Sequence, residues 1–249
     1  MSIPHNNNFN TYDFVFEKRY GNALLQLTNS DISAIQTLLP HKSSVIIDIG
    51  SGTGRLAIPL ALKGHKVFAV DQSEGMNDVL TQKAHKQNLN IPTSLSLMNG
   101  ENIKADLVLS IFTVLAYITD EVALKNMFGD IFKSLNAGGL FLFDLADKEP
   151  YLNKFDCNNG VIFQNRQNEF MDLVTVSFHL NLEHCTYRET VIGTNNGRPF
   201  SYTEEFVIRF WKFDTVNLLL IQSGFVQSEI PISINIPGTK YYLFQKPLK

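Results

Sequence analysis

The feature that most constrains the fold is a glycine-rich turn that follows a short apolar run. Residues Ser44 to Ile49 are rich in valine and isoleucine. The last two residues of this run begin the segment Asp48-Ile49-Gly50-Ser51-Gly52-Thr53-Gly54. An apolar run this short, bounded by glycines, is typical of a buried parallel strand. Glycine permits positive φ in a tight turn and leaves no Cβ where a ligand crosses the backbone. The pattern predicts a strand, a ligand-binding turn and a helix beginning near Thr53.

The same order of strand and helix repeats along the chain up to Asp144. Helical spacing separates the apolar runs, with Ser73 and Thr119 as expected N-caps of two helices. Strands that alternate with helices of 10–15 residues predict a doubly wound α/β sheet with right-handed crossovers. Further strands are expected at residues 66–70, 94–98, 106–111, 140–143 and 241–244, and helices at 30–39, 53–63, 73–87, 119–135 and 216–223.

The periodicity changes to two between residues 155 and 210. In the segment Val174 to Leu180 the even positions are apolar and the odd positions polar, and a similar run follows Phe200, although Glu204 interrupts it. Asn196-Gly197 is a strong hairpin signal, because a type I′ turn needs positive φ at both central residues. We therefore expect residues 155–210 to form a small antiparallel sheet inserted into a main domain made of residues 1–154 and 211–249.

Composition excludes several classes of protein. Of the 249 residues, 44% are hydrophobic and 18% are charged, as in soluble globular proteins, and the net charge of −3 gives no basic surface for nucleic acid or anionic membranes. No apolar run reaches the length of about 18–20 residues that crosses a bilayer, and residues 1–20 do not resemble a secretory signal. Two cysteines are too few for a disulfide framework or a zinc site. We expect a cytoplasmic protein with no structural metal.

An acidic residue at the end of the second strand supports a nucleoside ligand. Asp71 lies 17 residues after Gly54, and a carboxylate there can accept two hydrogen bonds from a ribose diol. The dinucleotide fingerprint G-x-G-x-x-G would require a third glycine where this chain has Arg55. The pattern found is acid-x-G-x-G-x-G. A dinucleotide enzyme and a glycine turn without a ligand remain alternatives.

The acid-x-G-x-G-x-G pattern resembles the first motif of the class I S-adenosylmethionine-dependent methyltransferases. The segment Val67 to Met76 is similar to the second motif of that family, and residues 106–112 resemble the fourth. Residues 99–102, Gly138-Gly139 and the late segment 210–225 are also similar to family motifs, so the resemblance covers about 190 residues. It implies a Rossmann-like, seven-stranded, mostly parallel sheet.

The resemblance also implies S-adenosyl-L-methionine as the cofactor and gives its residues roles. Asp71 would hold the ribose, a side chain near Met76 would pack on the adenine, and Glu101 would accept the adenine amino group, although aspartate is commoner there. The end of the fourth motif would lie under the methionine part. The implied cofactor-binding residues are Tyr12, Tyr20, Asp48, Gly50, Ser51, Gly52, Gly54, Asp71, Gln72, Met76, Gly100, Glu101, Asn102, Ser110 and Phe112.

A narrower resemblance connects the chain with small-molecule N-methyltransferases. Tyr12-Asp13 and Tyr20 resemble their N-terminal lid, and the antiparallel insert is similar to that of aminosugar N,N-dimethyltransferases and of glycine and sarcosine methyltransferases. In those families the insert covers the substrate or forms a dimer contact, so a homodimer is also conceivable here. Several aminosugar enzymes carry a histidine shortly after the position of Tyr117, but this chain continues with Ile118-Thr119.

Methyl transfer from a sulfonium needs few catalytic side chains. The main requirement is alignment at about 3–3.5 Å, and a general base is needed only for a protonated or weak nucleophile. Tyr117 follows the fourth strand and is the candidate catalytic residue, either orienting an amine or contacting the methyl group; a core aromatic is the alternative. The candidate substrate residues are Thr113, His179, Arg209 and Trp211, of which His179 could equally be solvated and the last two a structural hinge.

The sequence thus predicts methyl transfer from S-adenosylmethionine to a small molecule, at nitrogen rather than oxygen, with no metal, nucleic acid or membrane involved. An O-methyltransferase or a protein methyltransferase of the same fold is the alternative within that class. A regulator that binds the cofactor without chemistry, and a dinucleotide oxidoreductase or epimerase, are alternatives from other classes.

Overall fold

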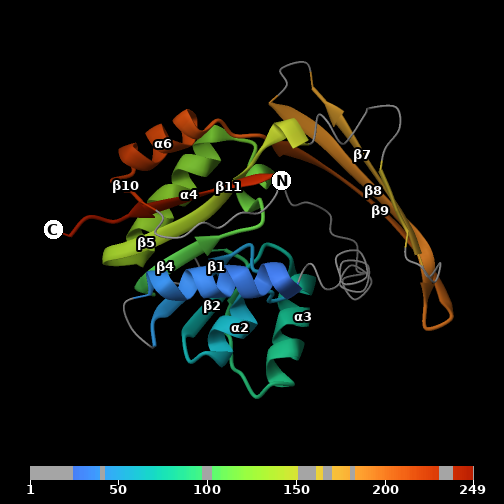
Figure 1. The fold of residues 1–249 in the computed structure, drawn as a ribbon, viewed down its shortest axis with the longest axis horizontal. Helices are drawn as coiled ribbons and strands as arrows, with labels where there is room; N and C mark the ends of the chain where they lie inside the picture. The colour runs from blue at the N-terminus through green and yellow to red at the C-terminus, as the bar shows by residue number, and fades with distance from the viewer. Residues whose placement is uncertain are drawn as a thin grey trace.

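A seven-stranded main sheet lies at the centre of the computed structural model, which describes residues 25–39, 43–96, 103–150, 161–164, 170–179, 183–229 and 238–248 (Figure 1). Its strand order is β10-β11-β5-β4-β1-β2-β3. Strands β1 to β5 pair in parallel, and β11 is antiparallel to both of its neighbours. The strands are β1 (Val45–Ile49), β2 (Lys66–Val70), β3 (Thr93–Ser94), β4 (Ala105–Ser110), β5 (Leu135–Ala146), β10 (Val226–Ser228) and β11 (Thr239–Gln245).

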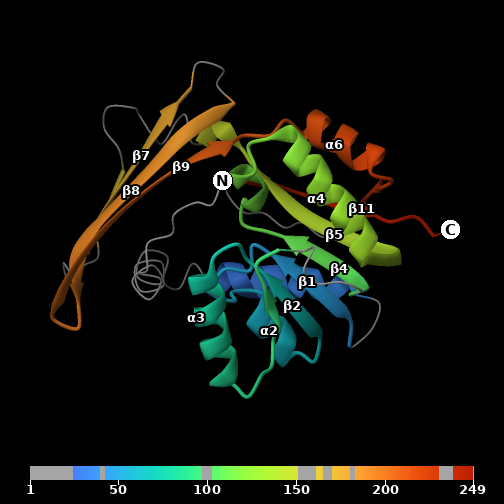
Figure 2. The same cartoon turned by 180° about the vertical axis from the view of Figure 1, so that it is seen from behind.

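Helices cover both faces of the main sheet (Figures 1 and 2). The helical residues 25–38, α2 (Ala57–Leu62) and α3 (Glu74–His85) pack on one face, around buried residues such as Ile35, Leu60 and Leu80. The helices α4 (Glu121–Ser134) and α6 (Phe213–Gln222) pack on the other face around Phe128, Phe141 and Leu220. Within the described ranges, no helix combines the length and the apolar character needed to cross a membrane. This layered arrangement confirms the predicted doubly wound α/β fold.

Capping residues and turns determine where the helices α2, α3 and α4 begin. The starts of α2 and α4 differ from the sequence-based expectation. Ser73 caps α3 as predicted, because its side chain accepts from the backbone N–H of Met76 at 3.2 Å. Asp120, not Thr119, caps α4, accepting from the N–H of Ala123 at 2.8 Å. The first residues after the glycine turn form turns, so α2 begins only at Ala57 and not near Thr53.

The glycine pair 138–139 lies inside a strand and does not precede it. Strand β5 begins at Leu135, directly after α4. The register between β4 and β5 shifts between Ala105 and Leu107, next to the glycines. A Cβ on Gly139 would come within 2.9 Å of the carbonyl oxygen of Asn136, so only glycine allows the backbones this close. The strand expected at 94–98 is also shorter: β3 covers Thr93–Ser94.

A second, antiparallel sheet, the side sheet, extends away from the main body (Figures 1 and 2). Its strand order is β6-β7-β8-β9. The turn between β8 and β9 has φ values of 52° at Asn196 and 74° at Gly197, as the hairpin signal predicted. The antiparallel insert is therefore present, while its exact limits at 155 and 210 stay a prediction. The strands are β6 (Val161–Gln164), β7 (Phe170–Phe178), β8 (His184–Asn195) and β9 (Arg198–Arg209).

Candidate cofactor and methyl-transfer site

The glycine turn after β1 presents open space at one position. Gly50, Gly52 and Gly54 all have positive φ, at 71°, 53° and 94°. A Cβ on Gly50 would overlap Val114, and one on Gly54 would lie 2.8 Å from Ile58, so these two glycines allow close packing. In contrast, no described atom lies within 4 Å of a Cβ built on Gly52. Gly52 is therefore the position over which a ligand can cross the backbone.

Asp71 lies directly beside this open position. Its carboxylate accepts from the backbone N–H of Gly52 at 2.9 Å and from that of Ser73 at 2.9 Å, one bond on each oxygen. A carboxylate has about four lone-pair sites, so the same two oxygens can still accept from a ribose diol. Asp71 thus joins the end of β2 to the glycine turn at the point where a sugar is expected.

Buried polar atoms near the turn fit the amino-acid part of S-adenosylmethionine. Asp48 Oδ2, Ser51 Oγ and Ser110 Oγ have no hydrogen-bond partner in the described part of the chain, although all three residues are buried. Desolvation by burial raises the pKa of Asp48 to about 7, against a smaller lowering by Arg55. Unsatisfied buried polar atoms are rare in native proteins. They occur here at the ends of β1 and β4, where an ammonium and a carboxylate can satisfy them.

The turn after β4 is strained and is held by a buried acid. Phe112 and Thr113 have φ values of 82° and 61°, and such conformations cost about 1–3 kcal/mol each in residues other than glycine. Asp144 at the end of β5 is fully buried, and its two carboxylate oxygens lie 2.9 and 3.0 Å from the N–H of Thr113. Desolvation raises the pKa of Asp144 to about 7. Sequence reasoning missed Asp144, whose only signal is an acid within the apolar run that ends β5.

Arg55 connects this turn with the helical residues 25–38. Its guanidinium group pairs with Asp31 at 2.6 Å and lies 5.2 Å from the centre of the Phe112 ring. The Asp31 side chain is 1% exposed, so the ion pair is buried on one side. Arg55 stands where a dinucleotide enzyme needs its third glycine. This contact gives the arginine a structural role at the edge of the site.

The predicted substrate residues lie at the junction of the two sheets. Tyr117 ends the short helix η2 (Val114–Tyr117) and is 45% exposed, with its ring 5.1 Å from that of Phe206 in β9. Trp211 is buried, and its indole N–H donates to the carbonyl oxygens of Leu115 at 3.1 Å and Ile118 at 2.9 Å. These contacts fix η2 against the strand that returns from the side sheet.

Of the other candidate substrate residues, Arg209 and Thr113 lie near the junction of the two sheets, and His179 lies at the end of β7. The Arg209 guanidinium stacks on Trp211 at 3.7 Å and donates to the carbonyl oxygen of Thr119 at 3.2 Å. Thr113 belongs to the strained turn. His179 is exposed at the end of β7, and its Nε2 lies 3.1 Å from Thr186 Oγ1. Substrate roles for these residues and for Tyr117 stay predictions.

Several predicted cofactor residues lie outside the residues that the structure describes. Tyr12, Tyr20, Gly100, Glu101 and Asn102 lie outside the described ranges. Gln72 follows Asp71 directly and Met76 lies in the first turn of α3; their contact with the adenine stays a prediction. Among the described side chains, no group of three or more metal-ligating residues comes together.

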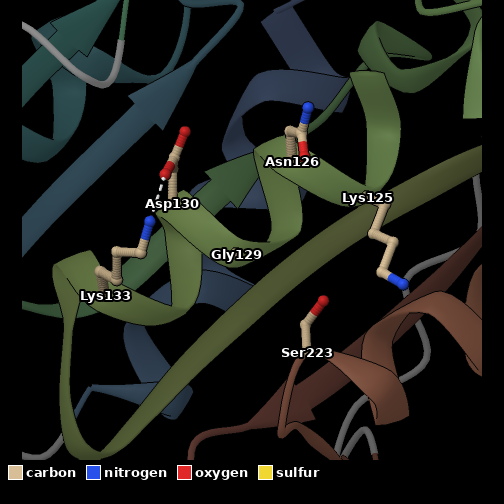
Figure 3. A pocket seen from close by; sticks show the side chains of 6 residues that line it. All are labelled: Lys125, Asn126, Gly129, Asp130, Lys133 and Ser223. Carbon is tan, nitrogen blue, oxygen red and sulfur yellow. Dashed lines mark hydrogen bonds and ion pairs between the residues drawn. The ribbon is translucent and has the colours of Figure 1, made fainter. Parts of the chain in front are cut away.

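A separate cavity of about 450 Å³ lies between α4 and α6 (Figure 3). Lys125, Asn126 and Lys133 line it from α4, and Ser223 faces them from the end of α6. Lys133 pairs with Asp130 at 3.0 Å. The cavity shares no residue with the glycine turn or with the junction of the two sheets, so it is not part of the predicted site.

Comparison with known proteins supports the interpretation of the glycine turn. Residues 46–139 match the model of a methyltransferase domain family. A protein of Geobacillus sp. (strain WCH70), provisionally classed as a methyltransferase, is 27% identical over 190 residues, which are 74% of this chain and 75% of that protein. The matched domain, residues 46–139, contains the glycine turn and Asp71.

Two solved structures share the fold. An S-adenosylmethionine-dependent methyltransferase from Clostridium acetobutylicum ATCC 824 superposes with a TM-score of 0.80 at 18% identity, covering 96% of this chain and 99% of its own. The sugar N-methyltransferase KedS8 from Streptoalloteichus sp. ATCC 53650 superposes with a TM-score of 0.76 at 12% identity, covering 95% and 92%. At these identities the similarity concerns the fold, including the side sheet.

The fold and the site together resemble those of class I methyltransferases. Residues 46–139 match a methyltransferase domain, the fold is that of S-adenosylmethionine-dependent methyltransferases, and the groups around the glycine turn fit S-adenosylmethionine as the cofactor. Asp71, Gly52 and the unsatisfied atoms of Asp48, Ser51 and Ser110 are the groups that fit it.

A pair of glycine substitutions separates cofactor contact from backbone strain. Gly52→Ala and Gly64→Ala both place a Cβ in open space at positive φ, so each should cost about 1–2 kcal/mol of stability. Only Gly52→Ala should weaken binding of S-adenosylhomocysteine, measured by calorimetry, because Gly64 lies at the far end of α2. Equal affinities for the two variants would contradict the proposed crossing over Gly52.

The raised pKa of Asp48 predicts a pH-dependent stability. Its folded-state pKa of about 7 lies above the unfolded value of 3.8, so the native state holds the proton more tightly. The free energy of unfolding therefore loses this contribution as pH rises from about 4 to about 7. Relative to the native protein, Asp48→Asn should become progressively more stable over that interval in urea unfolding, without cofactor. A difference that does not vary with pH would show that Asp48 is not buried as a protonated acid.

Proposed function

We propose that the enzyme transfers the methyl group of S-adenosylmethionine to an amine nitrogen of a small molecule. The observation that carries this proposal is an acidic face on the side sheet, next to Tyr117. When bound, the cofactor supplies a methyl group on a positively charged sulfur, so the protein must mainly bind and orient the acceptor. The inserted segment 155–210 is, in this proposal, the substrate-binding part of the enzyme.

The acidic face consists of Asp172, Glu189 and Glu204, one from each of β7, β8 and β9. In the pairing of β8 with β9, Glu189 lies opposite Glu204. In the pairing of β7 with β8, Glu189 lies opposite Val174, and Asp172 precedes Val174 by two residues in β7. Period-two geometry puts all three carboxylates on one face. Like charges directly opposite one another destabilise a sheet, and a cationic acceptor bound at this face would reduce the repulsion between Glu189 and Glu204.

Burial strengthens the case for a cation. Asp172 is fully buried and Glu189 is 6% exposed. Desolvation, and in second place the charge of Glu189, raise the pKa of Glu204. A carboxylate with a raised pKa can take up the proton that an ammonium group must lose before its nitrogen becomes a nucleophile. Glu204 is therefore the candidate proton acceptor of the acidic face.

Aromatic rings connect the acidic face with the end of β4. Phe206, two residues after Glu204 on the same face, stacks on Tyr187 at 4.9 Å and contacts Tyr117 at 5.1 Å between ring centres. Aromatic faces attract ammonium groups when they lie within about 6 Å. Carboxylates and rings together suit a protonated amine better than a neutral hydroxyl. The similarity of the fold to a sugar N-methyltransferase is compatible with this acceptor class.

Glu204 and Glu205 offer a matched test of the acidic face. Glu205 is the next residue, points to the other face of β9 and pairs with Arg188 at 3.6 Å on the surface. Glu204→Gln should raise the KM for an amine acceptor about tenfold, the effect of losing one charge-assisted hydrogen bond, and should lower kcat because the proton acceptor is lost, while Glu205→Gln leaves both constants unchanged. Both variants should bind S-adenosylhomocysteine like the native enzyme.

The acceptor itself is found with paired panels of amines and hydroxyl compounds. Amino sugars, amino acids and aliphatic amines are each offered beside an analogue that has a hydroxyl in place of the amine, and methylated products are detected by mass spectrometry. We expect N-methylated products, with rates that rise with pH as the amine loses its proton. Methylation of the hydroxyl analogues alone would contradict the proposal.

Tyr117→Phe tests the remaining candidate at the junction. The substitution keeps the ring contact with Phe206 and removes only the hydroxyl. If the hydroxyl orients the amine, kcat/KM for the amine found above should fall about tenfold with cofactor affinity unchanged. Unaltered kinetic constants would assign Tyr117 a packing role.

A further inference from the structure

The order of strands determines which part of the cofactor meets the turn after β4. In the main sheet β4, β1 and β2 are neighbours, and Asp71, the glycine turn and the turn at residues 112–113 follow these strands at their carboxyl ends. A Cβ on Gly50 would overlap Val114, so the two turns are in contact. A ligand with its sugar at Asp71 that crosses Gly52 therefore brings its other end to Phe112 and Thr113.

Two buried groups hold this turn in a conformation that its residues disfavour. Phe112 and Thr113 are consecutive residues with positive φ, and neither is glycine. Asp144 accepts from the N–H of Thr113 with both oxygens, and the Arg55 guanidinium lies against the Phe112 ring. Strained backbone persists only where the surroundings over-determine it, and it concentrates at functional sites. The strain here lies at the expected position of the sulfonium and amino-acid part of the cofactor.

We infer that Asp144 is a positioning residue for methyl transfer: by holding the Phe112–Thr113 turn, it shapes the wall that receives the amino-acid end of S-adenosylmethionine. Asp144 acts through the turn and does not itself touch the cofactor. The inference depends on the methyl-transfer function but not on the chemical class of the acceptor. It predicts that loss of Asp144 affects one end of the cofactor and spares the other.

The test compares two ligands that differ in that end. S-adenosylhomocysteine carries the amino-acid part, whereas 5′-methylthioadenosine keeps the adenosine and lacks it. In calorimetry, Asp144→Asn should weaken S-adenosylhomocysteine binding about tenfold, because one of the two acceptors for the turn becomes a donor. Binding of 5′-methylthioadenosine should stay within about twofold of the native value. The measurement needs no acceptor, so it is independent of the outcome of the amine panels.

Asp106→Asn is the matched control. Like Asp144, Asp106 accepts a hydrogen bond from a backbone N–H, that of Val45 at 2.9 Å. Asp106 lies at the start of β4, at the opposite end of the strand from the site. Its variant should lower the melting temperature without changing either affinity. If Asp144→Asn weakens both ligands equally, or neither, Asp144 serves the fold alone and the inference is wrong.

A second substitution tests whether the effect passes through the turn. Glycine adopts positive φ without strain, so Thr113→Gly should reduce the need for the carboxylate. The double variant Asp144→Asn/Thr113→Gly should bind S-adenosylhomocysteine more tightly than Asp144→Asn does, by about threefold or more. A double variant that binds no better would show that Asp144 acts by another route.

Discussion

Carboxylates that accept backbone N–H groups at strand ends hold the site together. Asp71 joins β2 to the glycine turn through Gly52, and Asp144 joins β5 to the turn that follows β4. In each case a carboxylate near the end of one strand fixes the loop that follows the neighbouring strand. These bonds therefore hold the glycine turn and the turn at residues 112–113 in place.

Arg55 places a positive charge near three buried acids, Asp31, Asp48 and Asp144. It pairs with Asp31, and its charge opposes the burial that raises the pKa values of Asp31, Asp48 and Asp144. An isolated buried carboxylate would be strongly destabilising. A glycine at position 55, as in the dinucleotide fingerprint, would leave these acids without that cation. The arginine at this position therefore has a structural role in this chain that a glycine would not supply.

The sequence predicted those parts of the site that depend on neighbouring residues in the chain. The strand–turn–helix around residues 45–62, the cap at Ser73 and the hairpin at Asn196-Gly197 are local patterns, and the structure confirms them. The bond from Thr113 to Asp144 spans 31 positions and exists only because β5 lies beside β4. Similarly, Glu204 looked like an interruption of an apolar face. Only the register of β8 and β9 shows that Glu204 lies opposite a second carboxylate, Glu189.

The junction of the two sheets connects the side sheet with the turns around the proposed cofactor site. Trp211 donates to two carbonyl groups of the η2 region, and Arg209 stacks on Trp211 while bonding to Thr119. The helix η2 begins directly after the strained turn that Asp144 holds, and it ends at Tyr117. One short segment therefore contacts the glycine turn through Val114 and the side sheet through Tyr117. Because a displacement of either sheet would move this segment, we propose that the packing around η2 sets the distance between the acceptor and the sulfonium methyl group, with few catalytic side chains required.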